Sequence, residues 1–205
     1  MELREALCQI TQIRQQMARS ETFRGYRAMT IAFSGALAMV AAMVQANVVP
    51  SPNEQVGAYL SLWISAAVIA VLVSGAELFW RARVSQSRLA RQSTILAVSQ
   101  FLPCIVVGGL LTFAIYARAK EVSWMLPGLW CVTFSLGIFA SYRLLPRQVF
   151  WIGAYYLGCG IAIIWNGAGS DALSPWMMGG SFGVGQLLAA GILYWTLERN
   201  DGKAT

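Results

Sequence analysis

The sequence predicts an all-α polytopic membrane protein, a bundle of six transmembrane helices preceded by a cytoplasmic amphipathic helix. Three observations lead to this fold class. Hydrophobic residues make up 57% of the 205 residues and charged residues only 12%, about half the charged fraction of a typical soluble domain. The hydrophobic residues form long runs, and a run of about 20 residues spans a hydrocarbon core about 30 Å thick. The basic residues gather at the ends of these runs.

The N-terminal segment, residues 1–27, is expected to form the amphipathic helix. Apolar residues recur there at steps of three or four and so share one helical face: Leu3, Leu7, Ile10, Ile13 and Met17. This apolar face is narrow and its spacing resembles a short coiled-coil contact. Residues 1–22 carry no net charge, unlike a helix that lies on anionic lipid. We therefore expect docking on another protein or a second copy of the chain; packing on its own cytoplasmic loops is the alternative.

Six spans follow, and they define a transmembrane domain of residues 28–196 with a short cytoplasmic tail at 197–205. We place the spans at residues 28–49, 57–80, 95–116, 124–141, 149–165 and 175–196. A cleavable secretory signal is the competing interpretation of the first span. The segment before it is long and contains three acidic residues, which a signal peptide lacks.

The orientation follows from a cluster of four arginines between the second and third spans: Arg81, Arg83, Arg88 and Arg91. With six spans, 13 of the 15 basic residues fall on the side of the two termini. Because positive charge is retained in the cytoplasm, both termini are expected inside, with Asn53 and Gly169 outside. Aromatic residues support these boundaries, since rings with a polar group favour the membrane interfaces. The expected outer ring includes Tyr59, Trp63, Tyr116, Trp124, Trp165 and Trp176, and the inner ring Trp80, Tyr142, Trp151, Tyr194 and Trp195.

Several classes of function are disfavoured by composition. The chain has no histidine, which removes histidine-based catalysis, histidine-ligated haem and the common zinc sites. Its four cysteines form no close pair in the sequence. The net charge of +6 lies at the ends of spans and does not indicate a nucleic-acid partner. We expect no enzymatic activity, no cofactor and no metal.

Glu77 is the only acidic residue inside an apolar run. An ionisable side chain in a span is a functional candidate, because its desolvation is costly. It lies near the inner end of its span, and Arg81 follows four residues later, at the spacing that favours an ion pair on a helix. An interfacial Glu77–Arg81 pair is therefore one interpretation, and a proton or cation relay is the other. Gln100 lies at a comparable depth on the next span.

The last span contains a glycine-rich run with a polar residue behind it: Gly179, Gly180, Gly183, Gly185 and Gln186. Small residues four apart allow helices to approach closely, and Gln186 could bond across such a contact. The alternative is a broken helix that exposes its backbone to a substrate, as in some transporters. We favour packing, since no second broken span mirrors this one.

Four stretches resemble an uncharacterised bacterial family of small six-span integral membrane proteins. They are TFRGYRA at 22–28, MLPGLW at 125–130, LLP at 144–146 and FGVGQLL at 182–188. The resemblance implies a multi-pass protein of the bacterial cytoplasmic (inner) membrane. It brings no activity with it, because no function is assigned to that family.

Two functions remain open at this point. The first is a non-enzymatic membrane protein that senses the membrane state or binds a partner. The second is a subunit of a small-solute or ion transporter or channel that uses Glu77, Gln100 and Gln186. A water-filled cavity reaching Glu77 or Gln186 would favour the second function, and a closed, dry bundle would favour the first.

Overall fold

The computed structural model describes residues 28–84, 88–142, 147–167, 171 and 173–198. The predicted N-terminal helix at 1–27 and most of the predicted tail lie outside these residues. Within them the fold class is confirmed. Six helices are long and apolar enough to cross a membrane, and no strand is present in the described ranges.

The spans follow one another as antiparallel helices. The first five are built by α2 (Ala28–Val48), α3 (Val56–Val84), α4 (Arg88–Arg118), a 3₁₀ turn η1 (Lys120–Met125) with α5 (Leu126–Ser141), and α6 (Val149–Asn166). The sixth is α7 (Pro175–Met178), a π-helical turn η3 (Gly179–Gly183), α8 (Val184–Leu193) and a second π-helical turn η4 (Tyr194–Glu198). Pro127 and Pro175 lie in first turns, as expected, where a missing N–H costs nothing.

The arginine-rich segment between the second and third spans is helical on both sides of residues 85–87. Helix α3 continues to Val84 and α4 begins at Arg88, so the arginines belong to two helices that extend past the apolar spans. Arginine is a good helix former, and a helix does not need to end where the hydrocarbon ends. Helix α4 also continues through Pro103 without a break.

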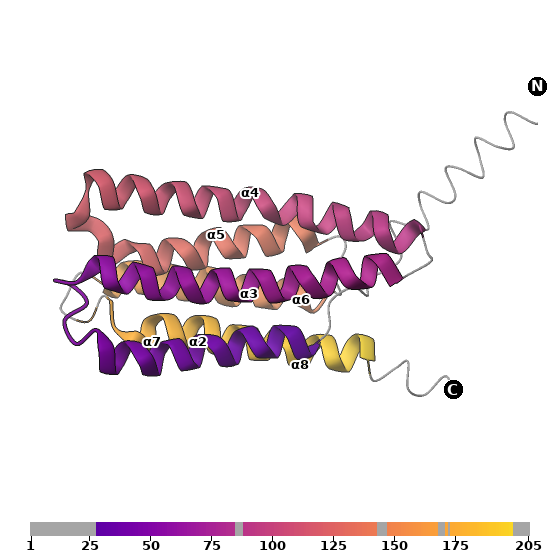
Figure 1. Cartoon of the computed structure of the whole chain (residues 1–205), viewed down its shortest axis with the longest axis horizontal. Coiled ribbons are helices and arrows are strands. Elements are labelled where there is room, and N and C mark those ends of the chain that lie inside the picture. Colours follow the sequence, from indigo (N-terminus) through magenta and orange to yellow (C-terminus); the bar gives the residue numbers. More distant parts are fainter. Residues whose placement is uncertain (1–27, 85–87, 143–146, 168–170, 172, 199–205) are drawn as a thin grey trace, which may run out of the picture.

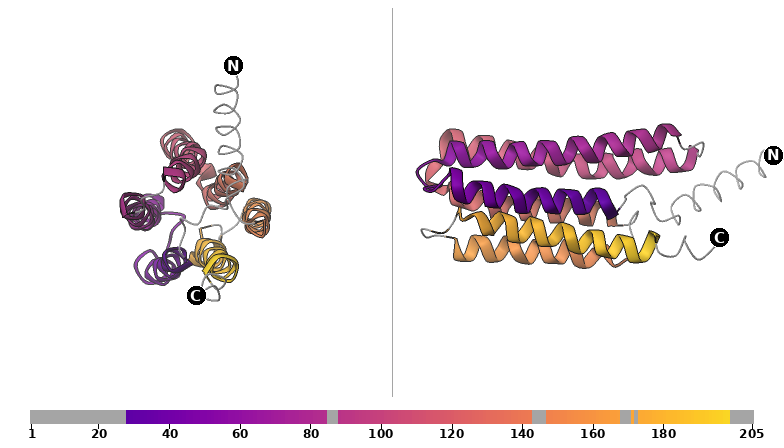
Figure 2. Two further views of the ribbon diagram at one scale, coloured as in Figure 1. Left: turned by 90° about the vertical axis from the view of Figure 1, so that its right-hand side faces the viewer. Right: turned by 60° about the horizontal axis from the view of Figure 1, so that its bottom comes forward.

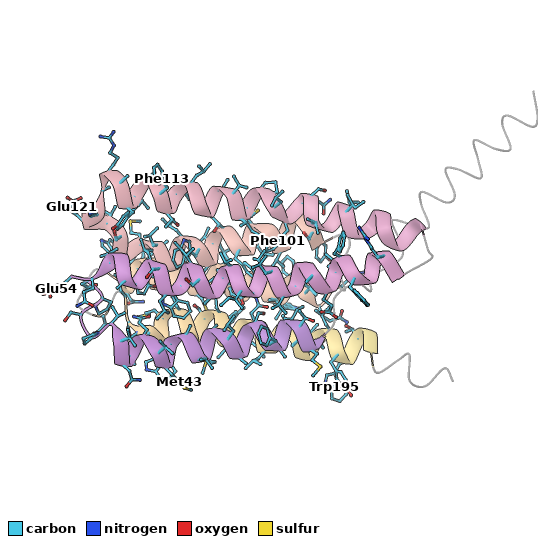
Figure 3. All side chains as sticks on the ribbon, viewed as in Figure 1. Met43, Glu54, Phe101, Phe113, Glu121 and Trp195 are labelled. Carbon is cyan, nitrogen blue, oxygen red and sulfur yellow. The ribbon has the colours of Figure 1, made fainter. Side chains whose placement is uncertain are left out.

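The six spans form a ring when the bundle is viewed along its axis (Figure 2). Around the ring the order is α2, α3, α4, α5, α6 and α8, and α8 packs against α2 to close it. The beginning of α2 lies at the same end of the bundle as the end of the last span (Figure 1). The α3–α4 connection lies at that end too, whereas Glu54 and Glu121 lie at the opposite end (Figure 3).

Helices approach one another closely at glycines in two places, between α2 and the last span and between α5 and α6. A Cβ added to Gly179 would lie 2.5 Å from the Cβ of Ala42, and one added to Gly35 would lie 3.0 Å from the carbonyl oxygen of Gly183. On the opposite side of the last span, α5 and α6 meet at Gly128 and Gly160, where an added Cβ would lie 2.8 Å from the partner's carbonyl oxygen. These distances leave no room for side chains, so the structure supports packing as the role of the glycine-rich run.

The aromatic rings fall partly where the sequence placed them. Trp80, Trp151 and Trp195 are exposed towards one end of the bundle, and Trp165 and Trp176 towards the other. Tyr59 and Trp63 lie in the first turns of α3, near the predicted end of the span, but they do not face the membrane: Tyr59 is fully buried and Trp63 is 4% exposed. Both face the interior of the ring, where they pack with Leu60, Leu126, Leu173 and Met178.

The two ends of the bundle allow the predicted orientation to be tested with cysteine substitutions. Asn53→Cys lies at an exposed position of the α2–α3 connection, and Gln148→Cys is exposed at the opposite end. Because the basic residues gather near position 148 and not near position 53, we expect a membrane-impermeant thiol reagent to label Asn53→Cys in intact cells. Gly169→Cys should behave in the same way.

Gln148→Cys is the matched control, and it should be labelled only after lysis. The parent protein, which keeps its own cysteines, sets the background. Labelling of Gln148→Cys in intact cells, with Asn53→Cys protected, would invert the predicted topology.

Candidate functional site

A cavity of about 770 Å³ lies inside the ring. Its walls come from α2, α3, α4, α5 and the last span, so it is a space shared by most of the bundle. The volume falls in the range of roughly 300–1,000 Å³ that is typical of small-molecule sites. The lining side chains are predominantly aliphatic and aromatic, and among the described residues none that lines the cavity is charged.

The cavity is long compared with its volume. On α3 it extends from Gly57 to Leu72 and on α4 from Phe101 to Tyr116. Fifteen residues of α-helix correspond to about 22 Å at about 1.5 Å per residue, which is most of a hydrocarbon core about 30 Å thick. The cavity therefore runs along the bundle axis and not across it.

Helices α3 and α4 form the weakly packed wall of this cavity. Only 17% of the apolar window of α3 and 11% of that of α4 is buried, compared with 44% for the α5 span and for the last span. Cavity-lining residues on this wall, such as Val68, Leu72 and Phe113, are also 49%, 64% and 72% exposed. The wall is thus the part of the bundle with the fewest protein neighbours.

An aromatic cluster lies on one side of the cavity, where α4 meets α5 and the last span. The ring of Phe134 lies 5.1 Å from Phe101, 4.8 Å from Tyr156 and 5.5 Å from Phe182, all in edge-to-face arrangements. These four rings come from α4, α5, α6 and the π-helical turn η3. Phe101, labelled in Figure 3, points from α4 towards α5, because a Cβ added to Gly137 would lie 2.6 Å from its ring. Edge-to-face contacts favour a defined orientation of each ring, and Phe101, Phe134 and Phe182 of this cluster give the cavity an apolar surface.

Gln45 fixes the indole ring of Trp63, which lines the cavity. The Gln45 side chain is fully buried; its Nε2 donates to the carbonyl oxygen of Leu173 at 2.7 Å, and its Oε1 accepts from Trp63 Nε1 at 2.7 Å. One amide therefore connects α2, α3 and the segment before α7. The sequence gives no local signal for this role of Gln45, because its two partners lie 18 and 128 residues away.

Most of the other polar side chains that line the cavity donate their hydrogens within the protein. Trp130 Nε1 donates to Thr112 Oγ1 at 2.8 Å, and Thr112 in turn donates to the carbonyl oxygen of Gly108. The hydroxyls of Ser34 and Thr133 donate to carbonyl oxygens of their own helices. These contacts satisfy the donors without help from water, and so the cavity surface behaves as a hydrocarbon surface.

Gln186 differs from these cavity residues. It lies at the middle of the Pro175–Thr196 span and lines the cavity. Its β-carbon packs at the contact between Gly35 and the last span. Within the described residues its side-chain amide makes no hydrogen bond, so both a donor and an acceptor are left for a ligand.

The three polar candidates from the sequence do not share one site. Gln186 lines the cavity, whereas Glu77 and Gln100 do not. Gln100 is half-buried, and its Oε1 has no hydrogen-bond partner among the described residues. Glu77 is half-buried on α3, but the side chain of Arg81 lies outside the described residues. The predicted Glu77–Arg81 pair therefore stays a prediction.

The π-helical turn η3 positions both Phe182 and Gln186. Two tyrosines of α6 bond to carbonyl oxygens of this turn: Tyr155 Oη donates to Gly180 at 3.2 Å, and Tyr156 Oη to Phe182 at 3.4 Å. A π turn leaves its carbonyls less well aligned with their helical partners, and nearby hydroxyls compensate for this. The glycine-rich run thus widens the helix without breaking it.

Comparisons of the chain with protein-family models, with curated proteins and with solved structures find no match. The resemblance to a bacterial six-span family is not tested by these comparisons. Within the described residues, no three side chains of the types that bind metals gather at one place.

The role of Gln45 can be tested by Gln45→Leu. The substitution keeps the volume but leaves Trp63 Nε1 and the Leu173 carbonyl without their partner, which costs about 1–3 kcal/mol of unfolding free energy for buried groups. Unfolding of the purified protein in micelles, followed by circular dichroism, measures this. Asn47→Leu is the matched control: Asn47 lies two residues away, is exposed, and bonds only to Met43 of its own helix. Equal unfolding free energies for the two variants would contradict a stabilising role for Gln45.

Proposed function

We propose that this chain is a non-enzymatic membrane protein that senses the state of the bilayer by holding a hydrophobic molecule in its central cavity. The observation that supports this function is the cavity itself, which is about 770 Å³ in volume and lined by side chains whose donors are mostly satisfied. Water gains few hydrogen bonds on such a surface, whereas a hydrocarbon loses nothing there. A bacterial inner membrane is the location that the sequence resemblance implies.

The weak packing of α3 and α4 suggests a path by which a ligand enters the cavity from the bilayer. A molecule dissolved in the bilayer reaches the ring from the side, and α3 and α4 have the fewest protein neighbours to displace. Occupancy then changes the packing of these two helices, which is the differential interaction that a sensor requires. A partner bound by the N-terminal helix, residues 1–27, would read out this change.

Filling the cavity tests this proposal. Gly109 lines the cavity, and a Cβ added there meets no atom within 4 Å. Gly109→Phe should therefore occupy the cavity without displacing a neighbour and abolish the saturable binding of a deuterated straight-chain alkane to the purified protein in micelles. Mass spectrometry after solvent extraction measures the bound alkane.

The matched control is Gly158→Phe. Gly158 is also exposed in mid-helix with no atom within 4 Å of an added Cβ, but it does not line the cavity. Binding to this variant should equal that of the wild type. Saturable binding that survives Gly109→Phe, or its absence from the wild type, would overturn the proposal.

The second candidate function is a transporter or channel subunit. One observation favours it: a cavity does reach Gln186, so the bundle is not the closed, dry one that the sensing function led us to expect. Three observations count against it. The cavity walls are apolar, no described residue that lines them is charged, and Glu77 and Gln100 lie elsewhere.

Glu77→Gln separates the two functions. If Glu77 contributes only an interfacial ion pair, the substitution should lower the unfolding free energy by about 1 kcal/mol or less. Proton flux into vesicles reconstituted with the protein should be the same for the variant and the wild type. Flux that is present in the wild type and lost in Glu77→Gln would establish the relay instead.

A further inference from the structure

The cavity contains one polar feature that an acyl chain would not use. Gln186 lies at the centre of its span, 11 residues after Pro175 and 10 before Thr196, so its amide is at mid-membrane depth. An unpaired amide in an apolar environment costs free energy unless a ligand pairs with it. The ester groups of a phospholipid stay near the interface, and only hydrocarbon would reach this depth.

The hydrogen-bond donors that line the cavity restrict the chemical class of the ligand further. Trp63 and Trp130 donate to Gln45 and Thr112, and the hydroxyls of Ser34, Thr112 and Thr133 donate to backbone carbonyls. Tyr116 lies at the outer end of the cavity, and a cysteine thiol such as that of Cys104 is a weak donor. At mid-depth, the Gln186 amide is therefore the strong donor that remains for a ligand.

Hydrogen-bond acceptors in the cavity are more numerous than free donors. Each of the three hydroxyl oxygens keeps lone pairs that are able to accept from a ligand. A ligand with a hydroxyl group would thus find several partners along the cavity, whereas a ligand with a carbonyl group depends on Gln186. The cavity length of about 22 Å on α3, at about 1.5 Å per residue, requires an elongated molecule.

We infer that the cavity binds an uncharged, elongated hydrocarbon that carries a carbonyl oxygen, with the Gln186 amide donating to that oxygen at mid-membrane depth. The aromatic cluster around Phe134 lies against the same cavity and provides an apolar wall for the rest of the molecule. This inference rests on the proposed function, and it adds the chemical class of the ligand and the residue that selects it.

The test compares three probes of equal chain length: a ketone with its carbonyl at mid-chain, the secondary alcohol and the alkane. The wild type should bind the ketone more tightly than the alkane, and its carbonyl stretching band should shift to lower frequency in the infrared spectrum. Gln186→Leu should weaken ketone binding about tenfold, as expected for the loss of one hydrogen bond. It should also remove the infrared shift while leaving alkane binding unchanged.

Gln100→Leu is the matched control, because it makes the same change at an amide that does not line the cavity. It should leave all three probes unaffected. The infrared band in the wild type tests the inference even if Gln186→Leu fails to fold, since an unshifted ketone band would overturn it.

The remaining outcomes separate this inference from the proposed function. If ketone and alkane bind equally and Gln186→Leu changes neither, carbonyl recognition is refuted and the hydrophobic site stands. If the alcohol, and not the ketone, depends on Gln186, the assigned chemistry is wrong. If no probe binds the wild type, both proposals fall.

Discussion

The bundle depends on the close approach of helix backbones at glycine. In a bilayer, hydrophobic burial does not drive helices together, because lipid chains are as apolar as the side chains. Association then relies on packing and on hydrogen bonds, and both require that the helices come near. Gly35 and Gly183 provide this between α2 and the last span, and Gly128 and Gly160 provide it between α5 and α6. The glycines Gly75, Gly108 and Gly109 on α3 and α4 make no comparable contact, since a Cβ added to any of them would meet no atom closer than 3.5 Å.

This uneven packing explains where the cavity lies. Helices α3 and α4 have small buried fractions, 17% and 11% of their apolar windows, and large side chains such as Trp63 and Phe101 lie between them and the rest of the ring. Gln45 and Thr112 then fix two indole rings that face the interior, so the space between the helices does not collapse. The cavity therefore lies between helices that pack closely at glycine and the weakly packed helices α3 and α4.

The sequence was sufficient for the spans and for the packing of the last helix, because both signals are local. Runs of apolar residues specify a span by length alone, and Gly179 and Gly183 specify a contact by their spacing. The end of a span does not specify the end of a helix, so the end of the second span near residue 80 did not indicate that α3 continues to Val84. Charge marks where the hydrocarbon stops and says little about where the backbone hydrogen bonds stop.

The cavity and its polar contacts were not predictable in the same way. Tryptophan is typical of the membrane interface, so the sequence suggests that Trp63 faces the lipid headgroups. In the structure Trp63 is buried, and its Nε1 donates to Gln45 on another helix. Gln186 was identified as a candidate, but the sequence grouped it with Glu77 and Gln100, which the fold places elsewhere. Such groupings depend on how the helices are rotated about their axes, and in a span that is apolar on all sides the sequence pattern does not fix that rotation.

The π-helical turn η3 has a consequence for which length changes the last span tolerates. A π turn holds one residue more than an α turn, so Gly179–Gly183 acts as a single-residue insertion in an otherwise regular helix. Removal of one residue from this run would convert it to α-helical geometry and leave Gln186 facing the cavity. The same deletion in a regular α-helical segment rotates the residues after it by about 100°, the angle per residue of an α-helix. The glycine-rich run is therefore the part of the last span where the loss of one residue preserves the direction of the side chains that follow.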